Sequence, residues 1–264
     1  MSLAAHALSY GYEGRVVGCA LDFTLDEGEV VCLLGPNGAG KTTFLRTLLG
    51  LIAPLQGRVT LAGADVAKLP RSAWARSVAY VPQATSSEFD FTLLDIVEMG
   101  RTAHLAAFAQ PSRHDREVSM RALERLGIAA LAERPIHSVS GGERQLALIA
   151  RALATQATHL LMDEPTANLD FGNQSLILDE VARLKASGAG ILFSTHHPDH
   201  ALRIADRVVM LRGGAVLASG ATAATLNSEN LSALYGRAVD VLEVVSPDGT
   251  RRRTCVARES PPLN

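Results

Sequence analysis

The stretch that decides the fold of this 264-residue chain reads Gly35-Pro36-Asn37-Gly38-Ala39-Gly40-Lys41-Thr42-Thr43. A short apolar run, 29–34, precedes it as a buried strand would, and 44–49 reads as the first turns of a helix. Strand, glycine-rich loop and helix in this order are the setting in which a phosphate-binding loop works. The stretch therefore predicts a nucleotide site.

The glycines of this loop allow successive backbone N–H groups to turn toward one centre, where the following helix adds about half a positive charge. Such a cradle suits a triphosphate. We expect Lys41 to reach the β and γ phosphates and the hydroxyl of Thr42 to bind the Mg²⁺ that bridges them. The same string also arises by chance as a glycine turn, so alone it predicts nucleotide binding and leaves the reaction open.

The composition is that of a globular protein without a broad surface for nucleic acid. An apolar fraction of 47% can fill a core, while the net charge is −2 and the isoelectric point is near 6.4. Basic residues are scattered except for Arg251-Arg252-Arg253, which we expect on a solvated strand or turn. No apolar run approaches the roughly 20 residues that a membrane-spanning helix needs. We therefore expect no nucleic-acid partner and no membrane span.

Segments of different character follow one another along the chain. Residues 1–82 alternate short apolar runs with turn signals, which predicts strands around the phosphate-binding loop and its helix. Residues 84–139 have helical periodicity and indicate an inserted helical subdomain. Residues 140–212 alternate helices and strands, as a parallel sheet covered by helices requires. Past residue 237, two β-rich runs flank a proline-led turn at 246–250 and predict a β-hairpin.

Two adjacent carboxylates, Asp163 and Glu164, end the apolar run that includes Leu160. Asp163, at the end of the predicted strand, can hold Mg²⁺ directly or through water. Because side chains alternate along a strand, we expect Glu164 to point elsewhere and to polarise a water in line with the γ-phosphate. Without the phosphate-binding loop, a surface acidic pair would explain these residues equally well. With it, they predict a hydrolytic site.

Ser140-Gly141-Gly142-Glu143 opens a predicted helix whose apolar positions follow helical spacing. Ser140 and Glu143 fit a capping box, so a well-capped helix is a complete physical explanation. The glycines favour a second interpretation, because glycine costs about 1 kcal/mol relative to alanine inside a helix. They also leave the first N–H groups uncovered, and such a helix end can bind an anion. The residues alone leave both interpretations open.

Taken together, these motifs resemble those of an ATP-binding cassette (ABC) ATPase, in the order in which that family has them. Residues 35–43 resemble its Walker A motif, 139–145 its signature and 160–164 its Walker B motif. Asn168-Leu169-Asp170 resembles its D-loop, and Thr195-His196 its switch histidine. The resemblance covers residues 1 to about 225.

Two further positions match the family, and two residues depart from its usual pattern. Gln83 falls at the position of the family's Q-loop glutamine, and Tyr12 at that of the aromatic residue that stacks on adenine, with Tyr10 the weaker candidate. Val139 replaces the usual leucine of the signature, and His197 replaces the commoner aspartate after the switch histidine. Neither departure removes a group that touches phosphate, so an active enzyme is expected.

The resemblance implies a fold and a set of roles. The fold is an α/β P-loop NTPase core with a parallel sheet, an N-terminal antiparallel β subdomain and an inserted helical subdomain at about 84–155. Glu164 would be the general base, His196 would bind the γ-phosphate and orient the water, and Gln83 would sense Mg²⁺ and water. Mg²⁺ would be held by Thr42, Gln83 and Asp163. ATP would be bound by Tyr12, Gly35, Asn37, Gly38, Ala39, Gly40, Lys41, Thr42 and Thr43.

The resemblance also implies a head-to-tail homodimer. Ser140, Gly141 and Gly142 of one chain would contact the γ-phosphate held by the loop of the other chain. Asp170 would join the two sites across the interface. The cofactors implied are ATP and Mg²⁺, and the site would be complete only when two chains close.

A single cassette without membrane spans resembles a subunit that docks on separate integral-membrane permease chains. Residues 80–83, 89–97 and 99–101 resemble the bacterial uptake cassettes for iron chelates, haem and cobalamin. The resemblance implies a peripheral protein on the cytoplasmic face of the inner membrane, with a periplasmic or lipoprotein substrate-binding protein acting indirectly. A molybdate-like oxyanion importer, an exporter ATPase and a non-transport ATPase remain open. We expect residues 1–225 to form the ATPase domain and 226–264 a C-terminal extension with a small β-hairpin.

Overall fold

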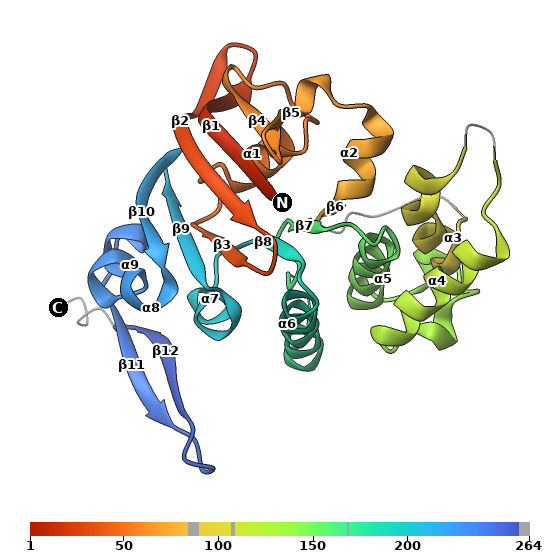
Figure 1. Ribbon diagram of the computed structural model, residues 1–264. Helices are drawn as coiled ribbons and strands as arrows, with labels where there is room; N and C mark the ends of the chain where they lie inside the picture. The colour runs from red at the N-terminus through yellow and green to blue at the C-terminus, as the bar shows by residue number, and fades with distance from the viewer. Residues whose placement is uncertain (84–89, 107–108, 168, 259–264) are drawn as a thin grey trace.

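The computed structural model describes residues 1–83, 90–106, 109–167 and 169–258. A six-stranded sheet lies at its centre (Figure 1), in the order β10-β9-β3-β8-β7-β6. The strands from β9 to β6 run parallel, and β10 joins β9 antiparallel at one edge. The predicted parallel sheet is confirmed, with one antiparallel edge strand added. Its strands are β3 (Val30–Leu34), β6 (Val78–Val81), β7 (His159–Met162), β8 (Gly190–Thr195), β9 (Arg207–Arg212) and β10 (Ala215–Ala221).

The central strand β3 leads into the phosphate-binding loop and is buried along its whole length. Both of its faces are covered, as is usual in a parallel sheet, and its side chains alternate between two cores. Val31 and Leu33 face the core that contains helix α1 (Lys41–Leu48). Cys32 and Leu34 face the larger core on the other side of the sheet. This burial on both faces gives the loop a rigid base.

A second sheet has the order β2-β1-β4-β5 and is antiparallel throughout. Leu3, Leu8 and Phe23 from this sheet share a core with Phe44 of α1. The predicted N-terminal antiparallel β subdomain is thereby confirmed. Its strands are β1 (Ser2–Tyr12), β2 (Arg15–Asp26), β4 (Gln56–Leu61) and β5 (Ala64–Asp65).

The expectation of strands throughout the rest of residues 1–82 is wrong for one stretch. A 3₁₀ turn (Val66–Lys68) and helix α2 (Arg71–Ser77) follow β5. Pro70 precedes α2 with a φ of −56°, close to the helical value. Trp74 is buried and donates from Nε1 to Leu49 O at 3.0 Å. The helix therefore forms where one large apolar side chain packs onto the end of α1.

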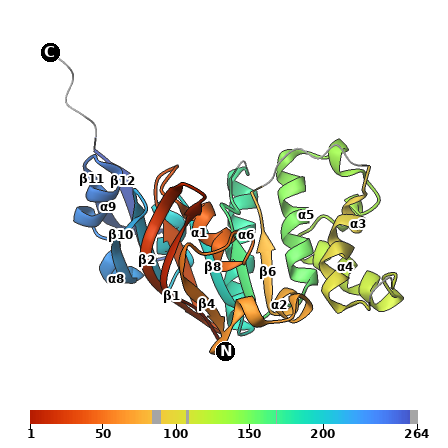
Figure 2. The same ribbon diagram turned by 90° about the horizontal axis from the view of Figure 1, so that it is seen from above.

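Helices gather at one end of the molecule, as Figures 1 and 2 show, and confirm the predicted inserted helical subdomain. Thr92 with Asp95, and Ser112 with Asp115, form capping boxes that start the first two α-helices. The elements are α3 (Leu93–Glu98), a 3₁₀ helix (Met99–His104), α4 (Arg113–Arg125), two 3₁₀ turns (Ala129–Leu131 and Ile136–Ser138) and α5 (Gly141–Ala154).

The C-terminal part of the chain lies at the opposite end of the molecule from α3 and α4 (Figures 1 and 2). Strands β11 and β12 pair antiparallel over the residues where the sequence predicts a hairpin. The division of the chain at residue 225 remains a prediction. No helix of the described residues is long and apolar enough to cross a membrane. Helix α6 (Phe171–Ala186) lies in the middle of the molecule, between α7 (Pro198–Ile204) and α5 (Figure 1). The elements at the C-terminal end are α8 (Thr222–Thr225), α9 (Ser228–Tyr235), β11 (Val239–Val245) and β12 (Arg251–Ala257).

Candidate active site

The phosphate-binding loop joins the buried end of β3 to the N-terminus of α1. Gly40 is the N-cap residue of α1 and has a φ of 98°, a conformation that side chains disfavour. A Cβ on Gly40 would lie 2.8 Å from Val17 Cγ1, and a Cβ on Gly35 would lie 2.5 Å from Leu211 O. Glycine is therefore required at both positions by the close approach of neighbouring strands.

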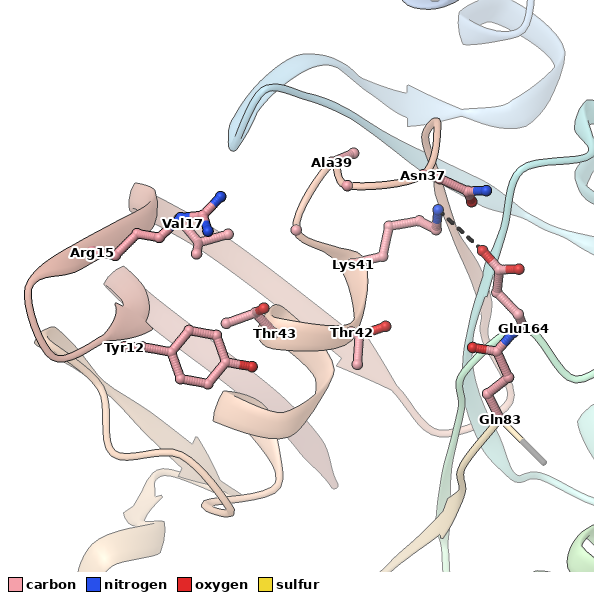
Figure 3. A pocket seen from close by; sticks show the side chains of 12 residues that line it. Tyr12, Arg15, Val17, Asn37, Ala39, Lys41, Thr42, Thr43, Gln83 and Glu164 are labelled. Carbon is pink, nitrogen blue, oxygen red and sulfur yellow. Dashed lines mark ion pairs between the residues drawn. The ribbon is translucent and has the colours of Figure 1, made fainter. Parts of the chain in front are cut away.

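A cavity of about 420 Å³ opens over this loop (Figure 3). It brings together residues predicted for adenine, phosphate and hydrolysis, together with Arg15 and Val17, which the sequence analysis missed. The signal for Arg15 was the turn after Tyr12, because the two residues pair across the β1–β2 hairpin. The cavity is lined by Tyr12, Arg15, Val17, Asn37, Gly38, Ala39, Gly40, Lys41, Thr42, Thr43, Gln83 and Glu164.

The two tyrosines near the end of β1 have different surroundings. Tyr12 is 48% exposed and lines the cavity. Tyr10 is fully buried, with its ring centroid 5.3 Å from that of Phe44. Burial raises the pKa of Tyr10 to about 12. Tyr10 is therefore a core residue, and Tyr12 is the tyrosine that a base bound in the cavity can reach.

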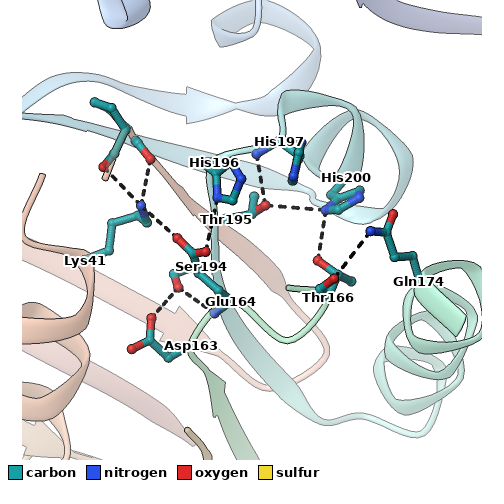
Figure 4. A network of polar contacts seen from close by, with 12 residues as sticks. Lys41, Asp163, Glu164, Thr166, Gln174, Ser194, Thr195, His196, His197 and His200 are labelled. Atoms are coloured by element: carbon teal, nitrogen blue, oxygen red, sulfur yellow. Dashed lines mark hydrogen bonds and ion pairs between the residues drawn. The ribbon is translucent and has the colours of Figure 1, made fainter. Parts of the chain in front are cut away.

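Lys41 connects the phosphate-binding loop to the predicted general base (Figure 4). Its buried Nζ donates to Gly35 O at 2.7 Å and to Pro36 O at 3.1 Å. The same Nζ lies 3.2 Å from Glu164 Oε1, and Glu164 Oε2 lies 3.1 Å from His196 Nδ1. Three side chains predicted for catalysis, carried by three separate segments, thus form one series of contacts.

The Glu164 side chain is oriented by its backbone conformation and by a hydrogen bond, not by alternation along a strand as expected. Strand β7 ends at Met162, so alternation along a strand does not orient Glu164, and that part of the prediction is wrong. Glu164 has a φ of 47°, a left-handed conformation that costs on the order of 1–3 kcal/mol. Its N–H donates to Ser194 Oγ at 2.9 Å, while Ser194 Oγ donates to Asp163 Oδ1 at 2.7 Å. Ser194 therefore fixes both acidic residues.

Sequence reasoning missed Ser194, although a signal was present. It is a polar residue near the end of β8, after the apolar run of that strand, and it is completely buried. A buried hydroxyl must find hydrogen-bond partners, and the neighbouring strand β7 supplies them at its end. A polar residue at the end of a buried parallel strand is therefore a candidate for organising a site.

The oxygen atoms predicted for Mg²⁺ come from both the wall of the cavity and the layer behind it. Thr42 and Gln83 line the cavity, whereas Asp163 is 2% exposed and does not. Hydroxyl, amide and carboxylate oxygens are the hard ligands that Mg²⁺ takes. In the described residues, no three His, Cys, Asp or Glu side chains gather as a metal site. The donor set fits an ion that uses few protein ligands and completes its shell with phosphates and water.

The predicted signature residues lie outside this cavity, at the start of α5. Ser140 Oγ accepts from Glu143 N at 3.2 Å, and Ser140 N donates to Glu143 Oε2 at 2.8 Å, so the predicted capping box is present. A Cβ on Gly141 would meet open space, while one on Gly142 would lie 3.3 Å from Leu169 Cδ2. Steric crowding therefore does not explain the glycine at 141.

The predicted D-loop also lies away from the cavity. Asp170 is the N-cap residue of α6, where its Oδ1 accepts from Asn173 N at 2.8 Å. Phe171, the next residue, is 86% exposed. Asn168 lies outside the described residues, as do 84–89 after Gln83. A single chain therefore does not bring Asp170 and the signature residues to the phosphate-binding loop.

Two further histidines lie beside His196 (Figure 4). The ring centroid of His197 is 4.1 Å from that of His196 and 5.1 Å from that of His200. His200 Nδ1 contacts the hydroxyls of Thr166 and Thr195 at 3.2 and 3.4 Å. Burial lowers the pKa of His200 to about 4 and also lowers the pKa of His197. These two rings are thus neutral at pH 7 and bring little charge to the site.

Comparisons with known proteins identify the family. The family model described as ABC transporter matches residues 20–167. The molybdate import ATP-binding protein MolC of Haemophilus influenzae is 40% identical, over 81% of this chain and 80% of its own. A probable iron chelatin transport ATP-binding protein of Helicobacter pylori is 36% identical, over 92% and 96%.

A solved structure described as an inward-facing conformation of a putative metal-chelate type ABC transporter has the same fold. Its TM-score is 0.86 at 34% identity, and the match covers 98% of each chain. The family match, the relatives and the phosphate-binding loop beside Glu164 and His196 lead to one conclusion. The chain belongs to the ABC transporter family, as one of its ATP-binding and ATP-hydrolysing proteins.

Proposed function

We propose that this chain is the ATP-hydrolysing subunit of an importer for a metal chelate of the iron-siderophore, haem or cobalamin type. The observation that carries the enzymatic part is the series of contacts from Lys41 through Glu164 to His196 beside a phosphate-binding loop. These groups lie where the γ-phosphate of a bound nucleotide and an attacking water meet. Hydrolysis then powers uptake through separate permease subunits.

The predicted site residues have separate tasks in this reaction. Tyr12 stacks on adenine, while Lys41 and the amide groups of the loop bind the phosphates. Glu164 accepts a proton from the attacking water, and His196 holds the γ-phosphate and the water in line. Gln83 would join Thr42 and Asp163 in holding Mg²⁺, whose charge neutralises the phosphates.

A second copy of the chain completes each site. Ser140, Gly141 and Gly142 present an exposed helix N-terminus that a single chain does not bring to its own cavity. Two chains in head-to-tail orientation place this positive helix end on the γ-phosphate held by the partner. Asp170 lies at the same interface and connects the two sites.

The names of similar proteins support the choice of cargo. One relative is named for iron chelatin transport, and the similar solved structure is described as metal-chelate type. A second candidate cargo is an oxyanion, because the relative MolC is named for molybdate import. In either case the chain acts as a peripheral subunit on permease chains at the cytoplasmic face of the inner membrane. A periplasmic or lipoprotein substrate-binding protein acts indirectly.

Glu164→Gln tests the assignment of the base. Glutamine keeps the size of the side chain but cannot accept the proton as a carboxylate does, so we expect phosphate release to fall about 10²- to 10⁴-fold. ATP binding should persist, and ATP should trap a dimer that size-exclusion chromatography detects. Glu133→Gln, which changes an exposed carboxylate of the helical subdomain, is the matched control and should keep the wild-type rate. Wild-type turnover in Glu164→Gln would refute the role of Glu164.

Uptake into proteoliposomes tests the cargo. The chain is co-purified with the permease encoded beside it, and ATP-dependent uptake of a ferric siderophore, haem, cobalamin and molybdate is compared. Uptake of one chelate that Glu164→Gln abolishes is the expected result. Uptake of molybdate alone would establish the second candidate. A chain that binds no permease and stays monomeric with ATP would overturn the importer function.

A further inference from the structure

The segment that carries the switch histidine is held at two points by the C-terminal part of the chain. Tyr235, the last residue of α9, donates from its hydroxyl to His196 O at 2.8 Å. Three residues after His196, Asp199 Oδ1 accepts from Thr254 Oγ1 at 3.1 Å and from Cys255 N at 2.9 Å. Both ends of residues 196–199 are therefore tied to elements past residue 225.

These elements are firmly connected to each other and to the core. Leu231 and Leu234 of α9 are buried in the larger core of the sheet. Ser232 Oγ accepts from Val239 N at 2.9 Å, and Ser228 Oγ accepts from Val241 N at 3.0 Å. Helix α9 and strand β11 thus form one unit that is anchored in the core. The position of the Tyr235 hydroxyl is therefore fixed relative to the central sheet.

The bond from Tyr235 acts on the backbone of His196 and leaves its ring to other partners. Burial raises the pKa of the Tyr235 phenol, so the hydroxyl keeps its proton and stays a donor. On the next residue, His197 N donates to Thr195 Oγ1 at 3.0 Å. Both bonds act on the same peptide unit, the one between His196 and His197, and so fix the main chain directly after the residue whose ring reaches Glu164 Oε2.

We propose that Tyr235 is a positioning residue for ATP hydrolysis, which fixes the main chain of His196 so that its ring meets Glu164 and the γ-phosphate. The C-terminal extension is then part of the hydrolytic machinery, although none of its described residues, 226–258, lines the cavity. Asp199 supports the same segment through β12. This inference rests on the role proposed above for His196.

Tyr235→Phe removes the hydroxyl and keeps the ring. The full-length chain with Mg²⁺ and ATP should lose about three- to tenfold in kcat, the range expected for one neutral hydrogen bond. The ATP concentration at half-maximal rate should stay unchanged, because Tyr235 does not line the cavity. Ser187→Ala is the control: it removes another hydroxyl that donates to a main-chain carbonyl, that of Leu184 at the end of α6, away from residues 196–199, and should keep the wild-type kcat.

A double-mutant cycle separates positioning from general destabilisation. If Tyr235 acts through His196, then Tyr235→Phe lowers kcat in the wild-type background and has no further effect in a His196→Ala background. Asp199→Ala should behave in the same way and provides a second variant. An equal loss in both backgrounds, an unchanged kcat in Tyr235→Phe, or a change confined to the half-maximal ATP concentration would each overturn the proposal.

The activities of His196→Ala and Tyr235→Phe distinguish the role of His196 from that of Tyr235. If His196→Ala keeps the wild-type rate, the role of His196 is wrong, and the inference about Tyr235 falls with it. If His196→Ala abolishes most of the activity while Tyr235→Phe has no effect, only the inference about Tyr235 is wrong.

Discussion

Single side chains set the geometry of this site through buried hydrogen bonds. Ser194 holds the backbone of Glu164 on one side and the carboxylate of Asp163 on the other. The left-handed φ of Glu164 is tolerated because this bond and the contacts of its carboxylate determine where the residue lies. These contacts hold Glu164, which follows the buried strand β7, in the position that the proposed hydrolysis requires.

The loss of folding stability at acidic pH should depend in part on His200. Burial lowers its pKa to about 4, so the unfolded chain takes up a proton on His200 near pH 6.5 and the folded chain only near pH 4. The contribution of this ring to stability is thus present above pH 6.5 and is lost as the pH falls toward 4. In His200→Asn, the thermal midpoint should fall less steeply between these pH values than in the wild type.

The same substitution at the exposed His114 is the control for the loss of one histidine. Wild-type pH dependence in His200→Asn would contradict the assignment, because all other titrating groups are common to the two proteins. The melting curves are followed by circular dichroism at constant ionic strength.

The residues expected to contact phosphate could be predicted from the sequence. The residues that hold other site residues in position could not. The loop from Asn37 to Thr43 can be recognised from the spacing of its residues, because phosphate binding by such a loop requires glycines and a lysine at these positions. Ser194 and Tyr235 are far in sequence from the groups they hold. Their roles depend on which strand or helix lies alongside, which one sequence does not state.

Among the elements, a buried ion pair connects the start of α4 to the end of α5 within the helical subdomain. Arg101 Nε donates to Asp115 Oδ1 at 2.9 Å, and Arg101 Nη1 donates to Ala154 O at 2.8 Å, at the end of α5. Both charged side chains are buried. The hydroxyl of Ser112 and the guanidinium of Arg101 hold the pKa of Asp115 well below its usual range. The pair fixes the start of α4 against the last turn of α5.

Arg101→Met should destabilise the protein by about 3–5 kcal/mol, because it leaves a buried carboxylate without its cation. The free energy of unfolding is measured by urea titration at pH 7. Arg113→Ala is the matched control. It removes an exposed ion pair with Glu117 on α4, the helix that carries Asp115, and should leave the urea midpoint unchanged. Equal midpoints for Arg101→Met and the wild type would show that the pair adds nothing to stability.

The elements next to the clearest motifs were predicted from the sequence, while short helices were missed. The buried run of β3 and the helical spacing of α5 leave one solution each. Helices α2 and α9 have only seven and eight residues, too few for a clear period. Their end signals were present, with Pro70 before one and Asn227 and Gly236 around the other. Such short helices form because tertiary packing holds them.

Across the whole molecule, the proposed homodimer assigns the phosphate-binding loop and the start of α5 of one chain to different sites. The cavity includes none of Ser140, Gly141, Gly142 or Asp170. Beside Asp170 lies Phe171, a large apolar side chain that is 86% exposed. An exposed aromatic residue next to polar groups is typical of an interface anchor. We therefore expect Phe171 to become buried when two chains close.

Phe171→Ala should weaken the ATP-dependent dimer at least about fivefold, as the loss of more than 1 kcal/mol at an anchor residue implies. Sedimentation velocity of the Glu164→Gln background with ATP measures the dissociation constant. Leu51→Ala is the control, because Leu51 is 63% exposed but lies beyond the end of α1 that is remote from the phosphate-binding loop. An unchanged dissociation constant in Phe171→Ala would place the interface elsewhere.

The separation of the two half-sites on one chain has a genetic consequence. A defective copy produced beside the normal one would enter mixed assemblies, and each mixed assembly would carry its lesion into a site shared with a normal subunit. Changes at Glu164 or Ser140 should therefore be dominant over the intact allele. A substitution that prevents association, such as a polar residue in place of Phe171, should be recessive, because the damaged product never joins its intact counterpart.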